Sequence, residues 1–259
     1  MEIPFYQVDA FTGEVFGGNP AGVCPLEKWL EDDLLQSIAM ENNLSETAFF
    51  VKKKNEYELR WFTPKVEIDL CGHATLASAY VIFNYLNPKL KKIDFQTKSG
   101  LLTVQMEKNL ISMDFPSRKP VPVIAPSHLV RGLGVEPVEV TKSRDYFALF
   151  ESEEQIKAIV PDFSELIKLD SLGVGITAPG HEVDFVSRFF APKAGVPEDP
   201  VTGSAHSSLI PYWAEKLNKN RLSAMQLSAR VGKLYCENKK DRVTIAGQAV
   251  TYAMGKIYI

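Results

Sequence analysis

The sequence predicts an α+β protein of two similar domains, each a curved, barrel-like and mostly antiparallel sheet around a central apolar helix. An unusual phrase occurs twice, at Arg60–Val81 and Arg188–Ile210: arginine, two aromatic residues, a small residue, proline and lysine lead through an acidic segment to a glycine. A run of apolar and small residues follows each glycine. A proline-rich stretch, Pro116–Ser127, separates the two halves of the 259-residue chain. We therefore expect one domain at 1–116, joined by the last strand at about 250–259, and a second at 117–249.

The first half contains alternating and β-branched segments, a turn-rich loop and one amphipathic segment. We expect strands at 4–11, 46–51, 57–62, 93–97, 101–106 and 110–115, a loop at 11–22, and helices at 31–44 and 72–86. The second half repeats this plan. We expect helices at 127–134, at 153–169 and from Gly203, and strands at 171–178, 183–191, 223–229, 233–237, 242–247 and 249–259.

The helix that follows Gly72 has no wide polar face, so it must be covered on all sides. Strands are the main elements available to cover it, which favours a sheet curved around this helix. The corresponding segment after Gly203 contains Pro211. Proline removes a backbone donor and clashes with the preceding turn, so we expect a kinked or shortened helix there.

A helix start presents unpaired N–H groups and the positive end of the helix dipole. A glycine at that point lets a ligand anion approach the backbone, so Gly72 and Gly203 are candidates for binding a substrate carboxylate. They also fit a second interpretation, in which they only permit tight turns. The doubling of the phrase favours the binding site.

Several reactive side chains accompany the two helix starts. They are Cys71, His73, Asp199, Ser204 and His206. Glu46 lies between a helix end and an apolar strand, where partial removal from water suits a carboxylate for acid–base work. Ordinary structural roles remain open for these residues: a solvated turn for Glu46, a helix-start imidazole for His73 and a turn former for Asp199.

The motifs FGGNPAGV, NLSE, the Cys-Gly-His-Ala helix start and GVPEDPVTGSAH, in this order, resemble the phenazine-biosynthesis (PhzF-like) family, relatives of diaminopimelate epimerase. The resemblance covers essentially the whole chain. It implies two domains of the epimerase fold with the site in the cleft between them. It also implies isomerisation by proton transfer, without a cofactor or a metal.

The resemblance also implies roles for individual residues. Glu46 of NLSE is the principal acid or base, with His73 and Asp199 as further catalytic residues. Gly72, Gly203 and Ser204 bind the substrate carboxylate. The more distant epimerases use a cysteine at each helix start, whereas only Cys71 is present here. A symmetrical two-thiol racemase is therefore not expected. Cys71 is expected to be a small buried residue at the helix start, and a role as an assisting acid or base stays open.

Several other functions are disfavoured. A net charge of −3 gives no reason to expect nucleic acid or a membrane surface as a partner. The four histidines lack clustered metal-ligand spacing, and Pro179 and Gly180 prevent the helix that a dinucleotide loop would need. Three dispersed cysteines and no signal peptide predict a cytoplasmic protein.

The expected partner is a small carboxylated metabolite. A non-catalytic binding or regulatory protein on the same scaffold is the alternative. Exposed strand edges would allow two copies of the chain to pair, so a homodimer is a further hypothesis.

Overall fold

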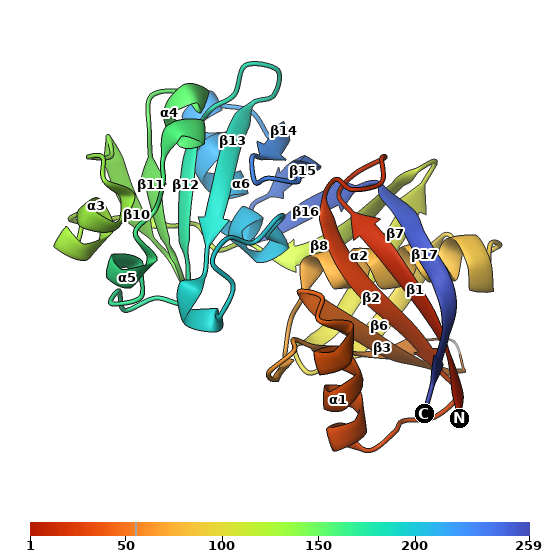
Figure 1. Cartoon of the computed structure of the whole chain (residues 1–259). Coiled ribbons are helices and arrows are strands. Elements are labelled where there is room, and N and C mark those ends of the chain that lie inside the picture. The colour runs from red at the N-terminus through yellow and green to blue at the C-terminus, as the bar shows by residue number, and fades with distance from the viewer. Residues whose placement is uncertain (55) are drawn as a thin grey trace. The chain divides into compact units, whose positions relative to one another are not determined.

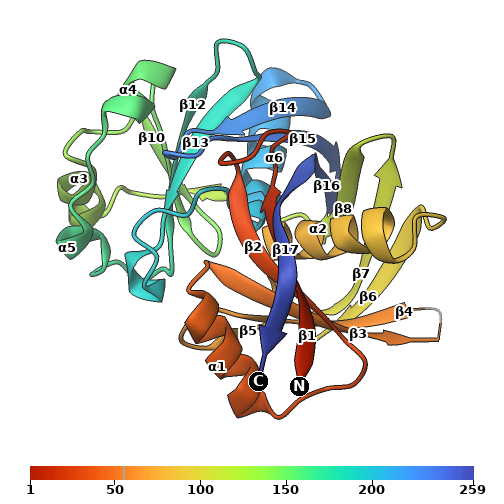
Figure 2. The ribbon, with the colours of Figure 1, turned by 45° about the vertical axis from the view of Figure 1, so that its right-hand side comes forward.

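Strands and their connections account for most of the chain in the computed structural model, which describes residues 1–54 and 56–259 (Figures 1 and 2). The chain divides into two compact units, Met1–Phe115 with Ile245–Ile259, and Pro116–Thr244. Among the described residues, none of the helices is both long enough and apolar enough to cross a bilayer.

The first unit has one continuous sheet. Its strands are β1 (Glu2–Ala10), β2 (Asn19–Leu26), β3 (Glu46–Lys53), β4 (Glu56–Phe62), β5 (Glu67–Ile68), β6 (Lys92–Thr97), β7 (Gly100–Glu107), β8 (Leu110–Pro116) and β17 (Ala249–Tyr258). Pairing runs from β17 through β1, β2 and β3 to β4, which pairs with both β5 and β6, and then to β7 and β8. Within this unit only the β2–β3 and β4–β6 pairs are parallel among the described strands. The sheet is therefore mostly antiparallel, as predicted.

A single apolar helix, α2 (Gly72–Val81), packs against β1, β2, β3 and β17. Every residue of α2 except Tyr80 is buried. A five-residue π-turn, η1 (Ile82–Leu86), continues it. The other helix, α1 (Asp32–Asn42), covers the sheet with Leu35, Ile38 and Ala39, which join the core cluster around Phe49. The prediction of a curved sheet around a helix without a polar face is confirmed.

The second unit has the same plan. Its strands are β9 (Val121–Pro122), β10 (Glu139–Lys142), β11 (Tyr146–Leu149), β12 (Val174–Pro179), β13 (Phe185–Phe190), β14 (Arg221–Gln226) and β15 (Gly232–Lys239), and β16 (Arg242–Gly247) leads back to the first unit. Its helices are α3 (Ser127–Leu133), α4 (Glu153–Ala158), α5 (Phe163–Leu166) and α6 (Gly203–Leu217), with a short 3₁₀ turn, η2 (Pro192–Ala194). Helix α6 is fixed to the sheet by Trp213, which stacks on Phe185 of β13 and donates to Thr177 of β12.

The doubled phrase corresponds to a structural repeat with the same strand register. In each unit a parallel strand pair leads into an antiparallel pair and then into a second parallel pair, as β2–β3–β4–β6 and as β11–β12–β13–β14. Phe62 of β4 lies opposite Thr47, and Phe190 of β13 lies opposite Val174. The second parallel pair starts five residues before each phenylalanine, at Tyr57 and Phe185. The two halves therefore use one topology in one register.

The structure corrects three expectations about single elements. Strand β2 begins at Asn19, inside the segment expected to be a loop, because the backbone of Asn19–Val23 pairs with β1. The strands β10 and β11, which were not expected, are short and lie between the helices predicted at 127–134 and 153–169. The helix expected at 153–169 is two short helices, α4 and α5, with Pro161 between them.

Helix α6 continues through Pro211 to Leu217, so the expectation that proline would shorten it was wrong. Pro211 cannot donate to the Ser207 carbonyl four residues earlier. The backbone N–H of Arg118 donates to that carbonyl instead, at 2.9 Å. The acceptor freed by proline is thus satisfied from outside the helix, which removes much of the cost of a proline inside it.

The repeat aligns Gly173, just before β12, with Glu46 at the start of β3. A Cβ atom on Gly173 would lie 2.2 Å from Cζ of the buried Phe189. We expect Gly173→Ala to lower the free energy of unfolding by about 1–3 kcal/mol, the usual cost of overpacking. Urea unfolding measures this change.

Gly255→Ala in β17 is the matched control, because its Cβ would meet no atom within 4 Å. That variant should unfold at or slightly above the wild-type urea concentration. Equal stability of the two variants would show that Phe189 yields to the added methyl group.

Candidate active site

Glu46 is delivered by the turn between α1 and β3. Helix α1 ends at Asn42 and is followed by Asn43, whose backbone is left-handed with φ 48°, and the chain then enters β3 at Glu46. The Asn42 amide donates to the Thr47 hydroxyl at 3.2 Å and ties the helix end to the strand start. The Glu46 side chain is only 13% exposed, so its carboxylate is held largely away from water.

His73 is the second residue of α2. Gly72 is the first residue of this helix, and Cys71 immediately precedes it. The His73 side chain is 5% exposed, and its Nε2 lies 3.0 Å from Oε2 of Glu46. These two atoms form a close ion-pair contact rather than an aligned hydrogen bond. The structure therefore brings together two of the predicted catalytic residues from segments 27 positions apart in the sequence.

The other ring nitrogen of His73 faces Asn19 and Cys71. Nδ1 lies 3.1 Å from Nδ2 of Asn19 and 3.5 Å from Sγ of Cys71. A primary amide can present either its NH₂ group or its oxygen to a ring nitrogen, so Asn19 fits both protonation states of the ring. Asn19 was not among the predicted site residues. Its only signal in the sequence is the FGGNPAGV motif in which it stands.

Burial and neighbouring charges act in opposite directions on His73. Burial lowers the pKa of His73, but Cys71 and Glu46 together outweigh it, so the pKa is raised well above 6.5. Burial, followed by the charge of Glu46, raises the pKa of the Cys71 thiol to about 11. Glu46, at 3.0 Å from Nε2, is the second neighbour that raises the pKa of His73. Near pH 7 Cys71 itself stays a neutral thiol because of its raised pKa. A thiolate nucleophile at Cys71 is disfavoured for the same reason.

Glu46, Cys71 and His73 each offer a ligand atom, and these atoms lie within 4.8 Å of one another. Their nearest contacts, however, are with different nitrogens of one ring, Glu46 with Nε2 and Cys71 with Nδ1. A metal ion bound to one ring nitrogen would lie on one side of the ring. The arrangement therefore fits a shared proton better than a shared metal.

The second helix start is built from the segment before α6. Asp199 is half-buried and accepts from the Thr202 hydroxyl at 2.6 Å. The buried Gln226 accepts from the Thr202 N–H at 2.8 Å and donates to the Asp199 carbonyl at 2.7 Å. The fully buried amide of Gln226 thus fixes Asp199 relative to Gly203, the first residue of α6.

Ser204, the second residue of α6, is approached by a cation that was missed in the sequence. Nη2 of Arg144 lies 3.3 Å from Oγ of Ser204, and Nε of Arg144 donates to the buried Asp145. Asp145 also accepts from the N–H of Gly173. The repeat aligns Ser204 with His73 and Gly173 with Glu46, so Arg144 adds positive charge where the second unit lacks the acid–base pair.

His206 belongs to the core of the second unit. It is fully buried, its Nδ1 lies 2.9 Å from the Thr202 carbonyl, and its ring packs near Phe185. Burial lowers its pKa to about 4, so it is neutral at physiological pH. A structural role explains these contacts.

The fold of the two units is that of the epimerase-like proteins. The structure aligns over 99% of the chain with a hydroxyproline epimerase from Agrobacterium vitis, of which 92% is covered, with a TM-score of 0.62 and 10% identity. At that identity the likeness concerns the fold alone.

A family model for phenazine biosynthesis-like proteins (PhzC-PhzF) matches residues 8–255. An uncharacterized isomerase of Pseudomonas aeruginosa is 51% identical over 259 residues, with both chains covered completely. The crystal structure of a PhzF-family phenazine biosynthesis protein from Enterococcus faecalis superposes with a TM-score of 0.98 at 50% identity over the whole of both chains. The chain belongs to the PhzF-like family. Family and fold together point to an isomerase- or epimerase-type activity.

The raised pKa of His73 can be measured without a substrate. We expect Glu46→Gln to lower it by about one unit or more, because the carboxylate that stabilises the imidazolium is removed. A histidine ¹H–¹⁵N titration measures both proteins, and His206 provides an internal reference that stays neutral at neutral pH.

The sign of the linked stability follows from the raised pKa. The contribution of His73 to the free energy of unfolding is fully present below about pH 6.5, the ordinary pKa of histidine. It is lost as the pH rises through the raised pKa of His73 in the folded protein. Glu41→Gln on the exposed face of α1 is the control and should leave the titration unchanged. Identical His73 titrations in wild type and Glu46→Gln would mean that the 3.0 Å contact does not hold the proton.

Proposed function

We propose that this protein is a metal-free and cofactor-free isomerase that moves a proton on a small carboxylated substrate. Glu46 removes the proton from a substrate carbon and returns it to the same or to another atom, so that no electrons are gained or lost. His73, whose Nε2 lies 3.0 Å from the Glu46 carboxyl group, can supply the compensating proton. The observation that carries this proposal is the buried contact between Glu46 and His73 at the start of α2.

The remaining assignments concern substrate binding. The N–H groups at Gly72, Gly203 and Ser204 are assigned to binding the anionic oxygens of the substrate. The residue that precedes each helix supports this assignment. Neither Cys71 nor Thr202 caps its helix with a side-chain hydrogen bond. The Arg144 guanidinium beside Ser204 adds positive charge at the second start. Preorganised donors of this kind can lower a barrier by several kcal/mol when charge develops on the substrate.

Asp199 is assigned to orienting the polar group of the substrate or relaying a proton. Its carboxylate is held by the Thr202 hydroxyl and its backbone by Gln226, which supports a fixed orientation. The substrate class follows from the charges at the helix starts, because an anionic group matches the dipole ends and Arg144.

Solvent exchange tests the proposal directly. The purified protein is incubated in D₂O with a panel of small carboxylates that carry an acidic C–H bond, and deuterium incorporation is followed by NMR. We expect wild type to label at least one compound and Glu46→Gln to label it at least about 100-fold more slowly, since acid–base catalysis contributes roughly 10²–10⁴.

Binding of the same compound separates catalysis from recognition. Glu46→Gln should bind it with a Kd within about threefold of wild type, which is less than 1 kcal/mol, and Glu41→Gln should retain full exchange. Undiminished labelling by Glu46→Gln would remove Glu46 from the role of base. Saturable binding by wild type without any exchange would instead identify a binding protein.

A further inference from the structure

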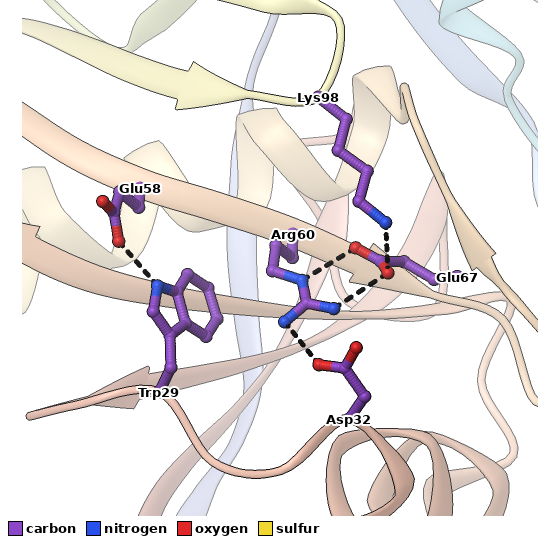
Figure 3. Close-up of polar contacts among 6 residues, drawn as sticks. All are labelled: Trp29, Asp32, Glu58, Arg60, Glu67 and Lys98. Atoms are coloured by element: carbon purple, nitrogen blue, oxygen red, sulfur yellow. Dashed lines mark hydrogen bonds and ion pairs between the residues drawn. The ribbon is translucent and has the colours of Figure 1, made fainter.

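Arg60 and Glu67 form a forked ion pair at the start of the doubled phrase. Nε of Arg60 donates to Oε1 of Glu67 at 2.8 Å and Nη2 donates to Oε2 at 2.9 Å (Figure 3). The side chains are only 19% and 15% exposed. This fork is the largest cause of two shifts: the pKa of Arg60 is raised and the pKa of Glu67 is lowered. Both groups therefore stay charged over the physiological range. Bidentate pairs of this kind are strong and geometrically specific.

The second copy of the phrase contains the same fork. Nε and Nη2 of Arg188 donate to the two oxygens of Glu198 at 2.8 and 2.9 Å. In each copy the phenylalanine two positions after the arginine lies under the guanidinium, with Cζ 5.1 Å from the ring of Phe62 and 5.0 Å from the ring of Phe190. In each copy the glutamate stands five positions before the glycine that begins the central helix.

The third nitrogen of each arginine binds a peripheral helix. Nη1 of Arg60 donates to Asp32 in the first turn of α1, at 2.9 Å. Nη1 of Arg188 donates to the carbonyls of Ile156 and Ile159 at the C-terminal end of α4, at 3.0 and 2.8 Å. Each guanidinium therefore joins a sheet strand, a helix and the segment that leads to the central helix.

The first fork connects the two segments that carry the acid–base pair. Arg60 is on β4, which pairs along its length with β3, the strand that begins at Glu46. Glu67 is on the segment that enters α2 and delivers His73. The backbone makes the same junction, because Ile68 pairs with Trp61. In the second unit the N–H of Asp199 donates to the Phe189 carbonyl at the matching position.

We propose that Arg60 and Glu67 are positioning residues that hold His73 against Glu46, and that Arg188 and Glu198 are their repeated counterparts before Asp199. The fork sets the distance between the β3–β4 strand pair and the start of α2. That distance determines how strongly the Glu46 carboxylate favours a proton on His73, because the attraction weakens with separation. The role in catalysis rests on the proposed function, whereas the effect on His73 does not.

Arg60→Lys tests this proposal, because it keeps the positive charge and removes the fork. We expect the pKa of His73 to fall by at least about half a unit, a roughly threefold loss of proton affinity. A histidine ¹H–¹⁵N titration at a temperature well below the Tm of the variant measures it. The direct electrostatic effect of residue 60 is retained, so a shift reports a change in geometry.

Two further variants complete the experiment. Glu67→Asp also keeps its charge while shortening the side chain, and it decides the matter if Arg60→Lys does not fold. Arg221→Lys makes the same substitution in an exposed ion pair between Arg221 of β14 and Glu237 of β15, and it should leave the His73 titration unchanged. A His73 pKa within about 0.1 unit of wild type in folded Arg60→Lys or Glu67→Asp, a change of only about 0.1 kcal/mol, would overturn the proposal, even if the Tm falls. Such a result would leave the fork a purely structural role.

Discussion

The contact between the buried Glu46 carboxylate and the buried His73 ring is the interaction on which the rest of the site depends. Taking either charge out of water is costly, and their mutual attraction offsets that cost only if the geometry is held. The surrounding contacts meet this requirement: Asn19 and Cys71 fix the far side of the ring, and Asn42 fixes the start of β3. A pair exposed to solvent would be screened and would hold the proton weakly.

Among the residues that the structure describes, the internal repeat provides two copies of one scaffold and only one copy of the acid–base pair. Glu46 aligns with Gly173, where Phe189 leaves no room for a side chain, and His73 aligns with Ser204. Cys71 aligns with Thr202, since each is the residue before its central helix. The second copy has Asp199 and Arg144 near its helix start instead. The duplicated part is therefore the strand register and the Arg–Glu fork, and the chemical groups differ.

The fold could be predicted because its main determinants are local in the sequence. The absence of a polar face on α2 and the doubled phrase are visible without long-range information. The continuity of α6 through Pro211 could not be predicted, because it depends on the N–H of Arg118, 89 positions from Ser207. Asn19 and Arg144 were missed for the same reason. Asn19 is 54 positions from its partner His73, and Arg144 is 60 positions from its partner Ser204. The roles of Glu46, His73, Asp199, Gly72, Gly203 and Ser204 stay predictions.

The asymmetry between the two copies limits the kind of proton transfer that the residues support. A two-base racemase needs an acceptor and a donor of similar strength on opposite faces of the substrate carbon. The cysteine expected at the second helix start of such an enzyme is replaced by Thr202, a poor acid and base, and Asp199 accepts a hydrogen bond from that hydroxyl. The first unit, in contrast, places one carboxylate and one proton-bearing imidazole together. A single pair that both takes and returns a proton works along one face of its substrate. Under the proposed function, the chemistry of these residues therefore favours moving a proton between two atoms over inverting one centre.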